Sequence, residues 1–245
     1  NAYTMLSKIE AKYIQSLYHK KQRDELSVFI VEGLKGVDEL LNSSFVVQKI
    51  FAVNDWEHPL MGKAQLTRVS EEELQKISGL QTANKVLAIA EQQNFIAQKP
   101  QKGRITLALD GIQDPGNMGT LIRIADWFGI HTILASEDSV EAYNPKVIQS
   151  TMGSFIRVKV GYGNLANLLT DVGIPIFGAL LEGDSVYNQA TIQEGVLLIG
   201  NESKGIHKEL LPFISSPVHI PRIGGAESLN AAVAAGILLS HLIKK

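Results

Sequence analysis

The chain of 245 residues contains no cysteine. This absence excludes disulfides, thiolate catalysis and cysteine-based zinc sites together, and it suits a protein of the reducing cytoplasm. The six histidines are scattered through the sequence without the spacing of metal ligands, so we expect no bound metal.

Long apolar runs are absent as well, and the start lacks a charged and then apolar secretory pattern. We expect Met5 to be the natural start and residues 1–4 to be a cloning remnant. With 45% hydrophobic and 20% charged residues, the composition is that of a globular chain able to form a packed core, long enough for two modest domains. The expectation is a cytoplasmic protein with no membrane partner.

An excess of positive charge, usual in proteins that bind nucleic acids, is also missing: the formal net charge is −2. Any RNA contact must therefore come from local groups. The densest basic cluster holds Lys20, Lys21 and Arg23, and a second lies between Lys99 and Arg104. Both are RNA-binding candidates, although a run of charges is more often a solvated surface or linker.

Two common nucleotide-binding patterns, G-x-G-x-x-G and G-x-x-x-x-G-K-[ST], do not occur. Residues 105–129 nevertheless predict a strand, a turn and a helix. Ile105–Leu109 is a short apolar run, turn-forming residues follow, and a helix is expected from Asn117 or Gly119 onward, ended by Gly129. Arg123 stands off the apolar stripe of that helix, near the strand ends where open α/β sheets bind ligands. Alone, this pattern fits an ordinary turn between a strand and a helix.

Two further unusual loops follow, GNESKG at residues 200–205 and IPRIGGAESLN at residues 220–230. Together with N-x-G-x-x-x-R at residues 117–123, they resemble the SpoU (TrmH-like) branch of the SPOUT RNA methyltransferases. Residues 143–154 occupy the place of that family's P-K-x-x-x-x-S-x-G segment. The resemblance covers the C-terminal half in the family's order, with Ala231-Ala232 after S-L-N as a mild departure.

The resemblance implies methylation of a ribose 2′-hydroxyl in structured RNA, with S-adenosylmethionine as donor. The positions that match the family's donor contacts are Leu180, Gly200, Ile220, Ser228 and Leu229. Loops rich in backbone groups at one sheet edge can hold a neutral purine through main-chain N–H and C=O groups. Ser228 could instead cap the last helix.

The resemblance makes Arg123 the catalytic position, with Asn117, Glu202 and Asn230 as further catalytic candidates. An arginine keeps its proton in proteins, so we expect Arg123 to bind a phosphate and stabilise a developing alkoxide. Glu202 could fix Arg123, and the proton acceptor stays open between a water, a phosphate oxygen and Glu202.

Ribosomal RNA of the 23S type is the expected substrate, with transfer RNA as the alternative. Two other classes remain possible: a non-catalytic RNA-binding factor in ribosome assembly, and a Rossmann oxidoreductase, which the missing G-x-G-x-x-G disfavours.

Three segments are expected: an RNA-binding domain at 5–92, a linker at 93–103 and a catalytic domain at 104–245. F-x-x-E-G at residues 29–33 resembles the ribosomal-protein-like domain that precedes many SpoU catalytic domains, although Glu32 fits a surface acid equally well. In the first half we expect helices at 7–19, 33–41 and 70–77 and strands at 28–31, 46–53 and 85–90. Ser70-Glu71-Glu72-Glu73 is a capping box.

In the second half we expect strands at 105–109, 131–135, 155–160, 175–180, 196–199 and 218–220. The fold class is α/β, with a mostly parallel sheet covered by helices on both faces. The resemblance adds a deep trefoil knot, which the rarity of knots would argue against. Asn144 and Asn164 each mark a helix start, and a last helix is expected at 228–243. Its C-terminal apolar residues, 238–243, predict a homodimer through the catalytic domains.

Overall fold

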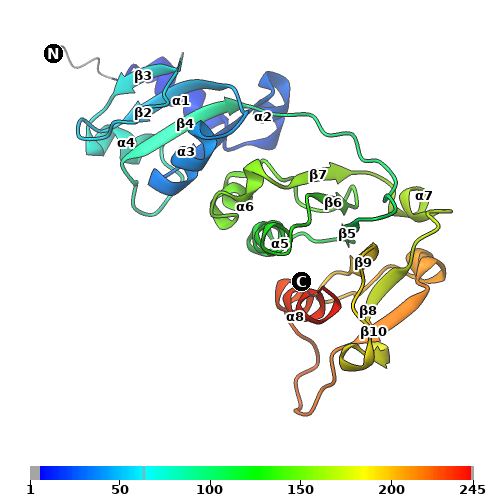
Figure 1. Ribbon diagram of the computed structural model, residues 1–245. Helices are drawn as coiled ribbons and strands as arrows, with labels where there is room; N and C mark the ends of the chain where they lie inside the picture. Colours follow the sequence, from blue (N-terminus) through cyan, green and yellow to red (C-terminus); the bar gives the residue numbers. More distant parts are fainter. Residues whose placement is uncertain (1–5, 63, 244–245) are drawn as a thin grey trace. The chain divides into compact units, whose positions relative to one another are not determined.

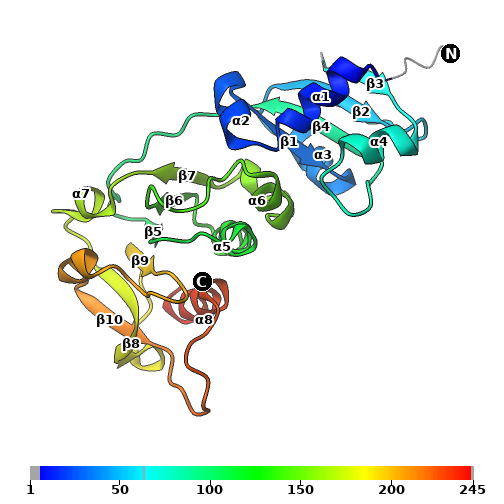
Figure 2. The same ribbon diagram turned by 180° about the vertical axis from the view of Figure 1, so that it is seen from behind.

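A computed structural model describes residues 6–62 and 64–243, so Met5 lies outside the described residues (Figures 1 and 2). The described chain forms two compact units. The first contains the residues up to Asn94 together with Glu141–Ile156, and the second contains Phe95–Val140 together with the chain from Arg157 onward.

A four-stranded sheet forms the centre of the first unit, in the order β1-β4-β2-β3. β4 runs antiparallel to both neighbours, whereas β2 and β3 are parallel. The elements are α1 (Lys8–Ser16), α2 (Lys20–Leu26), β1 (Val28–Glu32), α3 (Leu34–Leu41), β2 (Val47–Ala52), β3 (Gln65–Arg68), α4 (Glu71–Ile77), β4 (Val86–Glu91) and α6 (Pro145–Ser150).

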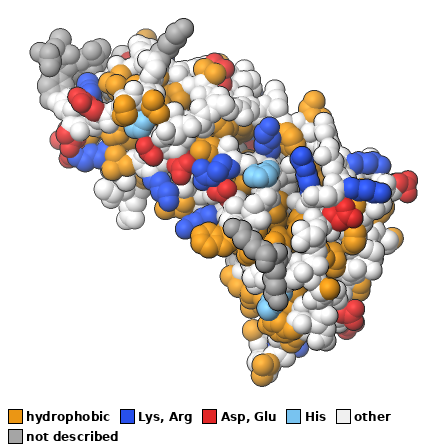
Figure 3. Space-filling model, in the orientation of Figure 1, with side chains coloured by type: hydrophobic (Ala, Val, Ile, Leu, Met, Phe, Trp, Pro, Cys, Tyr) orange, Lys and Arg blue, Asp and Glu red, His pale blue; other side chains and the backbone are white. Residues whose placement is uncertain are grey.

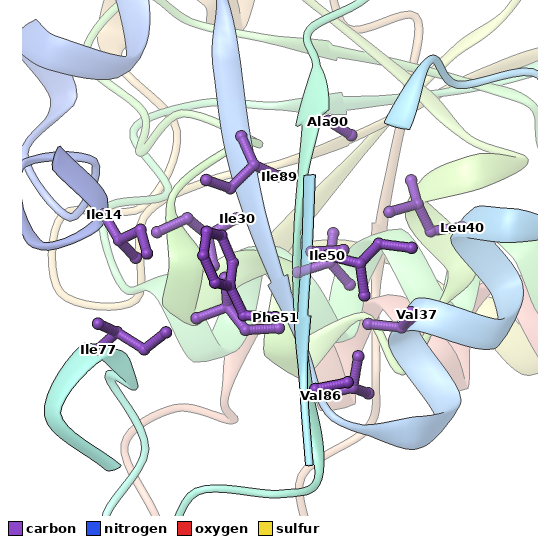
Figure 4. Packing of buried hydrophobic residues seen from close by; sticks show 14 of the residues in the cluster. Ile14, Ile30, Val37, Leu40, Ile50, Phe51, Ile77, Val86, Ile89 and Ala90 are labelled. Atoms are coloured by element: carbon purple, nitrogen blue, oxygen red, sulfur yellow. The ribbon is translucent and has the colours of Figure 1, made fainter. Parts of the chain in front are cut away.

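Buried side chains cover both faces of this sheet (Figure 4). Ile14 of α1 and Ile77 of α4 lie on one face with Phe51. Val37 and Leu40 of α3 lie on the other face, as expected when alternate strand residues point to opposite sides. The core of the first unit is therefore a sheet between two helical layers.

The segment Glu141–Ile156 packs into this core although it comes from the middle of the chain. Phe29 of β1 contacts the rings of Phe45, Tyr143 and Phe155, with centroids 5.4, 4.6 and 5.8 Å away. Ile148 of α6 is also buried in the same cluster. The segment that resembles the family's P-K-x-x-x-x-S-x-G pattern therefore serves as a layer of the first unit.

Local signals predicted most elements of the first unit. The capping box is present, because Ser70 accepts from the Glu73 amide while the Glu73 carboxylate accepts from the Ser70 amide. Two features were not predicted. The helix expected at 7–19 ends at Ser16, and the basic cluster that follows lies in a second short helix, α2. β3 was missed because its four residues carry no apolar alternation.

A six-stranded parallel sheet forms the second unit, in the order β10-β8-β9-β5-β6-β7. Its elements are β5 (Ile105–Leu109), α5 (Pro115–Trp127), β6 (Thr132–Ala135), β7 (Lys159–Tyr162), α7 (Leu165–Leu169), β8 (Ile176–Ser185), β9 (Gly195–Ile199), β10 (Ser216–His219) and α8 (Ala231–Leu242). The structure also has the 3-10 helices η1 (Ser154–Ile156), η2 (Val186–Asn188) and η3 (Lys208–Phe213). η1 belongs to the first unit, and η2 and η3 to the second.

Helices lie on both faces of the parallel sheet (Figures 1 and 2). On one face Ala108, Leu134 and Leu198 pack with residues of α7 and η3. The packed pair α5 and α8 lies on the other face. The predicted α/β class with a parallel sheet is confirmed, while the trefoil knot stays a prediction.

Three expectations for the second half need correction. The strand expected at 155–160 begins only at Lys159, because Ser154–Ile156 forms the 3-10 turn η1. α5 begins earlier than expected, at Pro115, with Asp114 as its N-cap. α8 begins at Ala231, and its N-cap is Asn230, whose side chain accepts from two backbone amides. Ser228 therefore does not cap the last helix.

Candidate active site

The three loops singled out by their sequence leave the same sheet edge, because they follow the carboxyl ends of the parallel strands β5, β9 and β10. β5 and β9 are neighbours, with Leu109 paired with Ile199, and only β8 separates β9 from β10. Ligands bind at this edge in open α/β sheets. The topology thus places the predicted site residues at a suitable edge.

Asn117 in the first turn of α5, Glu202 in the turn after β9 and Asn230 at the N-cap of α8 form a hydrogen-bonded cluster that we call the amide–carboxylate cluster. The Asn117 amide donates to Glu202 Oε1, and Asn230 Nδ2 donates to Asn117 Oδ1 at 2.8 Å and to Glu202 Oε1 at 3.4 Å. The carboxylate is therefore held by two neutral amides. Backbone amides hold the cluster in turn: Asn230 Oδ1 accepts from Ala232 and Val233 at 3.0 and 3.2 Å.

Arg123 is not part of this cluster. It lies six residues after Asn117 on α5, which is about 9 Å along the helix and about 240° around it. Its side chain is exposed, and it makes no hydrogen bond or ion pair with any residue that the structure describes. The expected contact between Glu202 and Arg123 is absent from this part of the chain, because Glu202 accepts from the two asparagines instead.

A second set of contacts holds the loop after β5, and the sequence did not point to it. Asp110 is 2% exposed and accepts from the His207 amide at 2.7 Å and from His207 Nδ1 at 2.8 Å. The hydrogen bond from Asp110 and its negative charge raise the pKa of His207. Asn201 Nδ2 donates to the carbonyl of Gly111, whose φ is +68°. No motif signals these contacts, since their partners lie about ninety residues apart.

The turn after β9 closes on itself at the predicted donor position Gly200. Asn201 and Gly205 exchange backbone hydrogen bonds of 3.0 and 2.8 Å. A Cβ atom at Gly200 would lie 2.3 Å from the carbonyl carbon of Gly205, so only glycine fits beneath the turn. Leu180 lies at the same level, because Gly178 pairs with Leu198, two residues before Gly200.

The loop from Ile220 to Leu229 is exposed throughout except at Ile220, which is half-buried. Its backbone N–H groups donate no hydrogen bond to other described residues, and the side chain of Leu229 is 46% exposed. Ser228 is exposed in the same loop. These groups are available to a ligand. The predicted donor positions therefore lie on three segments: the turn after β9, the loop after β10, and β8, which contains Leu180 just beyond its last pair with β9.

The basic cluster of α2 differs from its prediction. Arg23 is 1% exposed: it donates to the Leu17 carbonyl at 2.9 Å and forms an ion pair with Glu141. Arg23 cannot contact RNA in this fold, because packing and its partner bury its guanidinium. Lys20 and Lys21 are exposed but lie beside Asp24 and Glu25 in i,i+4 pairs.

Charge elsewhere on the surface is mixed. Basic side chains lie in small groups with acidic side chains among them on the face drawn in Figure 3. This agrees with a formal net charge of −2 and supports no broad basic field.

Glu32 of the F-x-x-E-G segment has a structural role. Its carboxylate accepts from Tyr18 Oη at 2.7 Å, from the Gly79 amide at 2.9 Å and from the Ser78 hydroxyl. These bonds attach the end of α4 to β1. Burial, with the nearby negative charge of Glu32, raises the pKa of Tyr18.

The apolar end of α8 packs inward rather than outward. Leu238, Leu239 and Leu242 are at most 1% exposed, so they cannot form the intersubunit face expected from the sequence. The exposed apolar side chains of the packed helices are instead Trp127 of α5 at 84% and Val233 of α8 at 51%.

Within residues 6–62 and 64–243, no group of three or more His, Cys, Asp or Glu could hold a metal ion, and no helix has the length and apolar character needed to cross a membrane.

Comparison with known proteins assigns the family. Residues 104–240, more than half of the chain, match the SpoU rRNA Methylase family. The chain belongs to the SpoU rRNA methylase family. Residues 8–88 match the MRM3-like substrate binding domain, so the resemblances expected for both halves are confirmed.

Relatives cover nearly the whole chain. The 23S rRNA (guanosine(2553)-2'-O)-methyltransferase RlmP of Bacillus subtilis is 31% identical over 234 residues, 93% of each chain. A putative RNA methyltransferase of the TrmH family from Porphyromonas gingivalis has a similar structure, with a TM-score of 0.87, 32% identity and 98% of each chain covered. The structure of an AdoMet-bound rRNA methyltransferase from Sinorhizobium meliloti is also similar, with a TM-score of 0.85 and 28% sequence identity; the match covers 97% of this chain and 95% of that chain.

Proposed function

We propose that the protein transfers a methyl group from S-adenosylmethionine to a ribose 2′-hydroxyl of ribosomal RNA. The observation that carries this proposal is the amide–carboxylate cluster. Three segments far apart in sequence bring Asn117, Glu202 and Asn230 into hydrogen-bond contact at the carboxyl edge of the sheet. Packing alone does not require such a cluster, since Glu202 is exposed.

The donor fits the residues beside the cluster. The free backbone N–H groups of the loop 220–229 and the exposed side chain of Leu229 suit an adenine, which offers ring nitrogens and an apolar face. Gly200 keeps the turn of residues 200–205 free of a side chain. Leu180, Gly200, Ile220, Ser228 and Leu229 are the residues that we propose to hold S-adenosylmethionine.

S-adenosylmethionine supplies a methyl group already activated on a sulfonium sulfur, so the chain has to align the hydroxyl and help it lose its proton. Glu202 is the proton acceptor that the geometry supports, because two amides orient its carboxylate and no cation pairs with it among the described residues. Arg123 keeps its proton and is free to bind an RNA phosphate beside the reacting ribose.

Ribosomal RNA is the favoured substrate because RlmP and RlmB, which match this chain at 31% and 34% identity, are both named 23S rRNA methyltransferases. Transfer RNA is the alternative. A ribosomal substrate agrees with a cytoplasmic protein. Lys20 and Lys21 remain proposed RNA contacts of the domain formed by residues 5–92, and Arg23 does not.

We also propose that two copies of the chain form a homodimer through their catalytic domains. Trp127 and Val233 lie on the packed helices α5 and α8, and both are exposed apolar side chains. Trp127→Glu with Val233→Glu should give a monomer by light scattering, and Leu60→Glu, at another exposed apolar position, is the control. A wild-type chain that is monomeric at micromolar concentration would remove this claim.

The activity is tested with labelled donor and RNA from a strain that lacks the gene. Ribosomal RNA should accept label at one ribose, mapped by mass spectrometry, and transfer RNA should not. Asn230→Ser keeps an N-cap for α8 but removes the amide that donates to Asn117 and Glu202, so turnover should fall while the melting temperature stays near that of the wild type. Undiminished turnover in Asn230→Ser would argue against the cluster as the reaction site.

A further inference from the structure

A cavity of about 150 Å³ lies within the first unit, between the β1–α3 junction and the segment that contains α6. Pockets for drug-sized ligands measure about 300–1,000 Å³. The cavity is therefore too small for a ligand of the size of S-adenosylmethionine and leaves room only for a smaller group.

Apolar side chains form the rim of this cavity. Leu34 at the start of α3 is 48% exposed and Met152 after α6 is 42% exposed, and both line it. Buried Val31 and Ile148 form its apolar floor. Two exposed apolar side chains beside an opening offer faces on which a flat ring can stack.

Three polar side chains line the same cavity without partners. Lys35, Asn84 and Gln149 are exposed, and none makes a side-chain hydrogen bond or ion pair with the described residues. The only acid in the lining is Glu32, whose carboxylate is occupied by Tyr18, Ser78 and Gly79. The free groups are thus two amides, each able to donate and accept, and one cation.

The backbone keeps the cavity open at a fixed shape. Met152 and Gly153 have φ of 52° and 97°, and a Cβ atom at Gly153 would lie 2.6 Å from the Glu39 side chain of α3. Such strained backbone persists only where the surroundings hold it. The segment therefore packs closely against α3 beside the cavity, at a position where only glycine fits.

We infer that this cavity binds one unpaired nucleotide of the substrate RNA, with the base between Leu34 and Met152, its edge read by Asn84 and Gln149, and an adjoining phosphate near Lys35. Proteins that read RNA sequence do so mainly on unstacked bases, through stacking and hydrogen bonds to the base edge. This inference rests on the proposed function, since it assumes an RNA substrate. It assigns a recognition role to a segment inside the catalytic half of the sequence.

The test measures binding of ribosomal RNA, from a strain that lacks the gene, to the full-length protein by filter retention. Asn84→Ala with Gln149→Ala should weaken binding by at least about tenfold, because two hydrogen bonds to the base are lost. The salt dependence should stay unchanged, because neutral side chains release no counterions. Gln81→Ala, also an exposed amide but outside the lining, is the matched control.

Lys35→Gln separates the phosphate contact from the base contacts. It should weaken binding and lower the salt dependence, whereas the exposed control Lys76→Gln should change neither. Nucleoside monophosphates at millimolar concentration should compete with RNA for the wild type but not for the double amide variant. A different result would overturn the inference: nucleoside monophosphates compete only for the wild type, yet Asn84→Ala with Gln149→Ala binds RNA as tightly as the wild type does. The cavity would then bind free nucleotides and not the RNA.

The two proposals fail in different ways. If the wild type binds donor and methylates RNA while the double amide variant binds RNA as tightly as Gln81→Ala, the inference fails and the proposed function stands. If the wild type neither binds nor methylates any RNA, both fail. Circular dichroism melting of each variant establishes that the fold is intact.

Discussion

We assign Arg123 to the substrate because its side chain has no hydrogen-bond or ion-pair partner among the described residues. Its guanidinium is exposed, so we expect it to act on the substrate rather than on the fold. Arg123→Lys keeps the charge but loses the planar fork, and it should lower kcat by about 10²-fold, nearly as much as Arg123→Ala. Donor affinity by calorimetry should not change.

The matched control is Arg104→Lys, at an exposed arginine before β5. Near-normal turnover in Arg123→Lys would exclude a bidentate contact and leave only a contribution from its charge.

His207 should make stability depend on pH. Its pKa is raised by Asp110, so the protonated ring is favoured in the folded state. A histidine whose pKa is higher in the folded state stabilises the fold at pH values below its ordinary, unfolded-state pKa. This contribution is lost as the pH rises through its folded-state pKa. His207→Gln should therefore be less stable than the wild type at about pH 5.5, with a smaller difference at about pH 8.5. The imidazole is 44% exposed, so the effect should be modest.

Urea denaturation at both pH values measures this difference. A gap between wild type and His207→Gln that widens with rising pH would mean that the contact with Asp110 involves a neutral imidazole.

At the scale of elements, the turn after β9 depends on Gly200. The backbone of Gly205 leaves no room for a Cβ atom there, so even Gly200→Ala should open the turn. We expect donor binding to fall by more than about tenfold, while the first unit, which shares no residue with this turn, keeps its fold. Calorimetry with S-adenosylmethionine measures the loss.

Gly236→Ala is the control, because Gly236 lies in α8 outside the proposed donor segments and a Cβ atom there would lie 3.7 Å from its nearest neighbour, Ile124 Cδ1. If Gly200→Ala and the control bind S-adenosylmethionine with equal affinity, the turn after β9 is not part of the donor site. Gly200→Val, a bulkier change, would not distinguish a blocked site from a distorted turn.

Elements with a local signal were predictable from the sequence. The strand Ile105–Leu109 has the expected bounds, and Asn144 and Asn164 cap helices as expected. Of the catalytic candidates, Asn117, Glu202 and Asn230 meet because parallel strands end at one edge, which topology alone predicts. The sequence could not reveal that Arg23 is buried against Glu141, 118 residues away. Burial of a charge depends on its tertiary partner, and no local pattern carries that information.

At the scale of the whole molecule, the ion pair of Arg23 and Glu141 connects α2 to the segment from the middle of the chain. Burial raises the pKa of Glu141, against the lowering effect of Arg23. Glu141→Ala would leave Arg23, 1% exposed, without a counterion, and should cost about 3–5 kcal/mol of the free energy of unfolding. Glu141→Gln, which still accepts a hydrogen bond, should cost clearly less.

Thermal melting of the two variants, with the exposed control Glu137→Ala, measures the difference. Equal stability of Glu141→Ala and wild type would mean that Arg23 finds water or another acceptor.

No single boundary in the sequence separates the two units, because residues 141–156 belong to the first unit. A truncation that removes the N-terminal half therefore also disturbs the packing of this segment. A chain starting near Lys102 retains the donor loops but loses the sheet on which Tyr143, Ile148 and Phe155 pack. Exposing three large apolar side chains together favours association. We therefore expect the truncated chain to bind a hydrophobic dye and to aggregate.

Replacing these three residues by polar ones, Tyr143→Ser, Ile148→Gln and Phe155→Gln, should restore a monodisperse truncated chain. That chain should bind S-adenosylmethionine with nearly wild-type affinity, because Leu180, Gly200 and Leu229 all lie in the second unit. It should bind RNA weakly, since it lacks the first unit. A truncated chain that is monodisperse without the three substitutions would show that residues 141–156 do not need the N-terminal sheet. The N-terminal and C-terminal halves of the sequence would then be two independent domains with a single boundary between them.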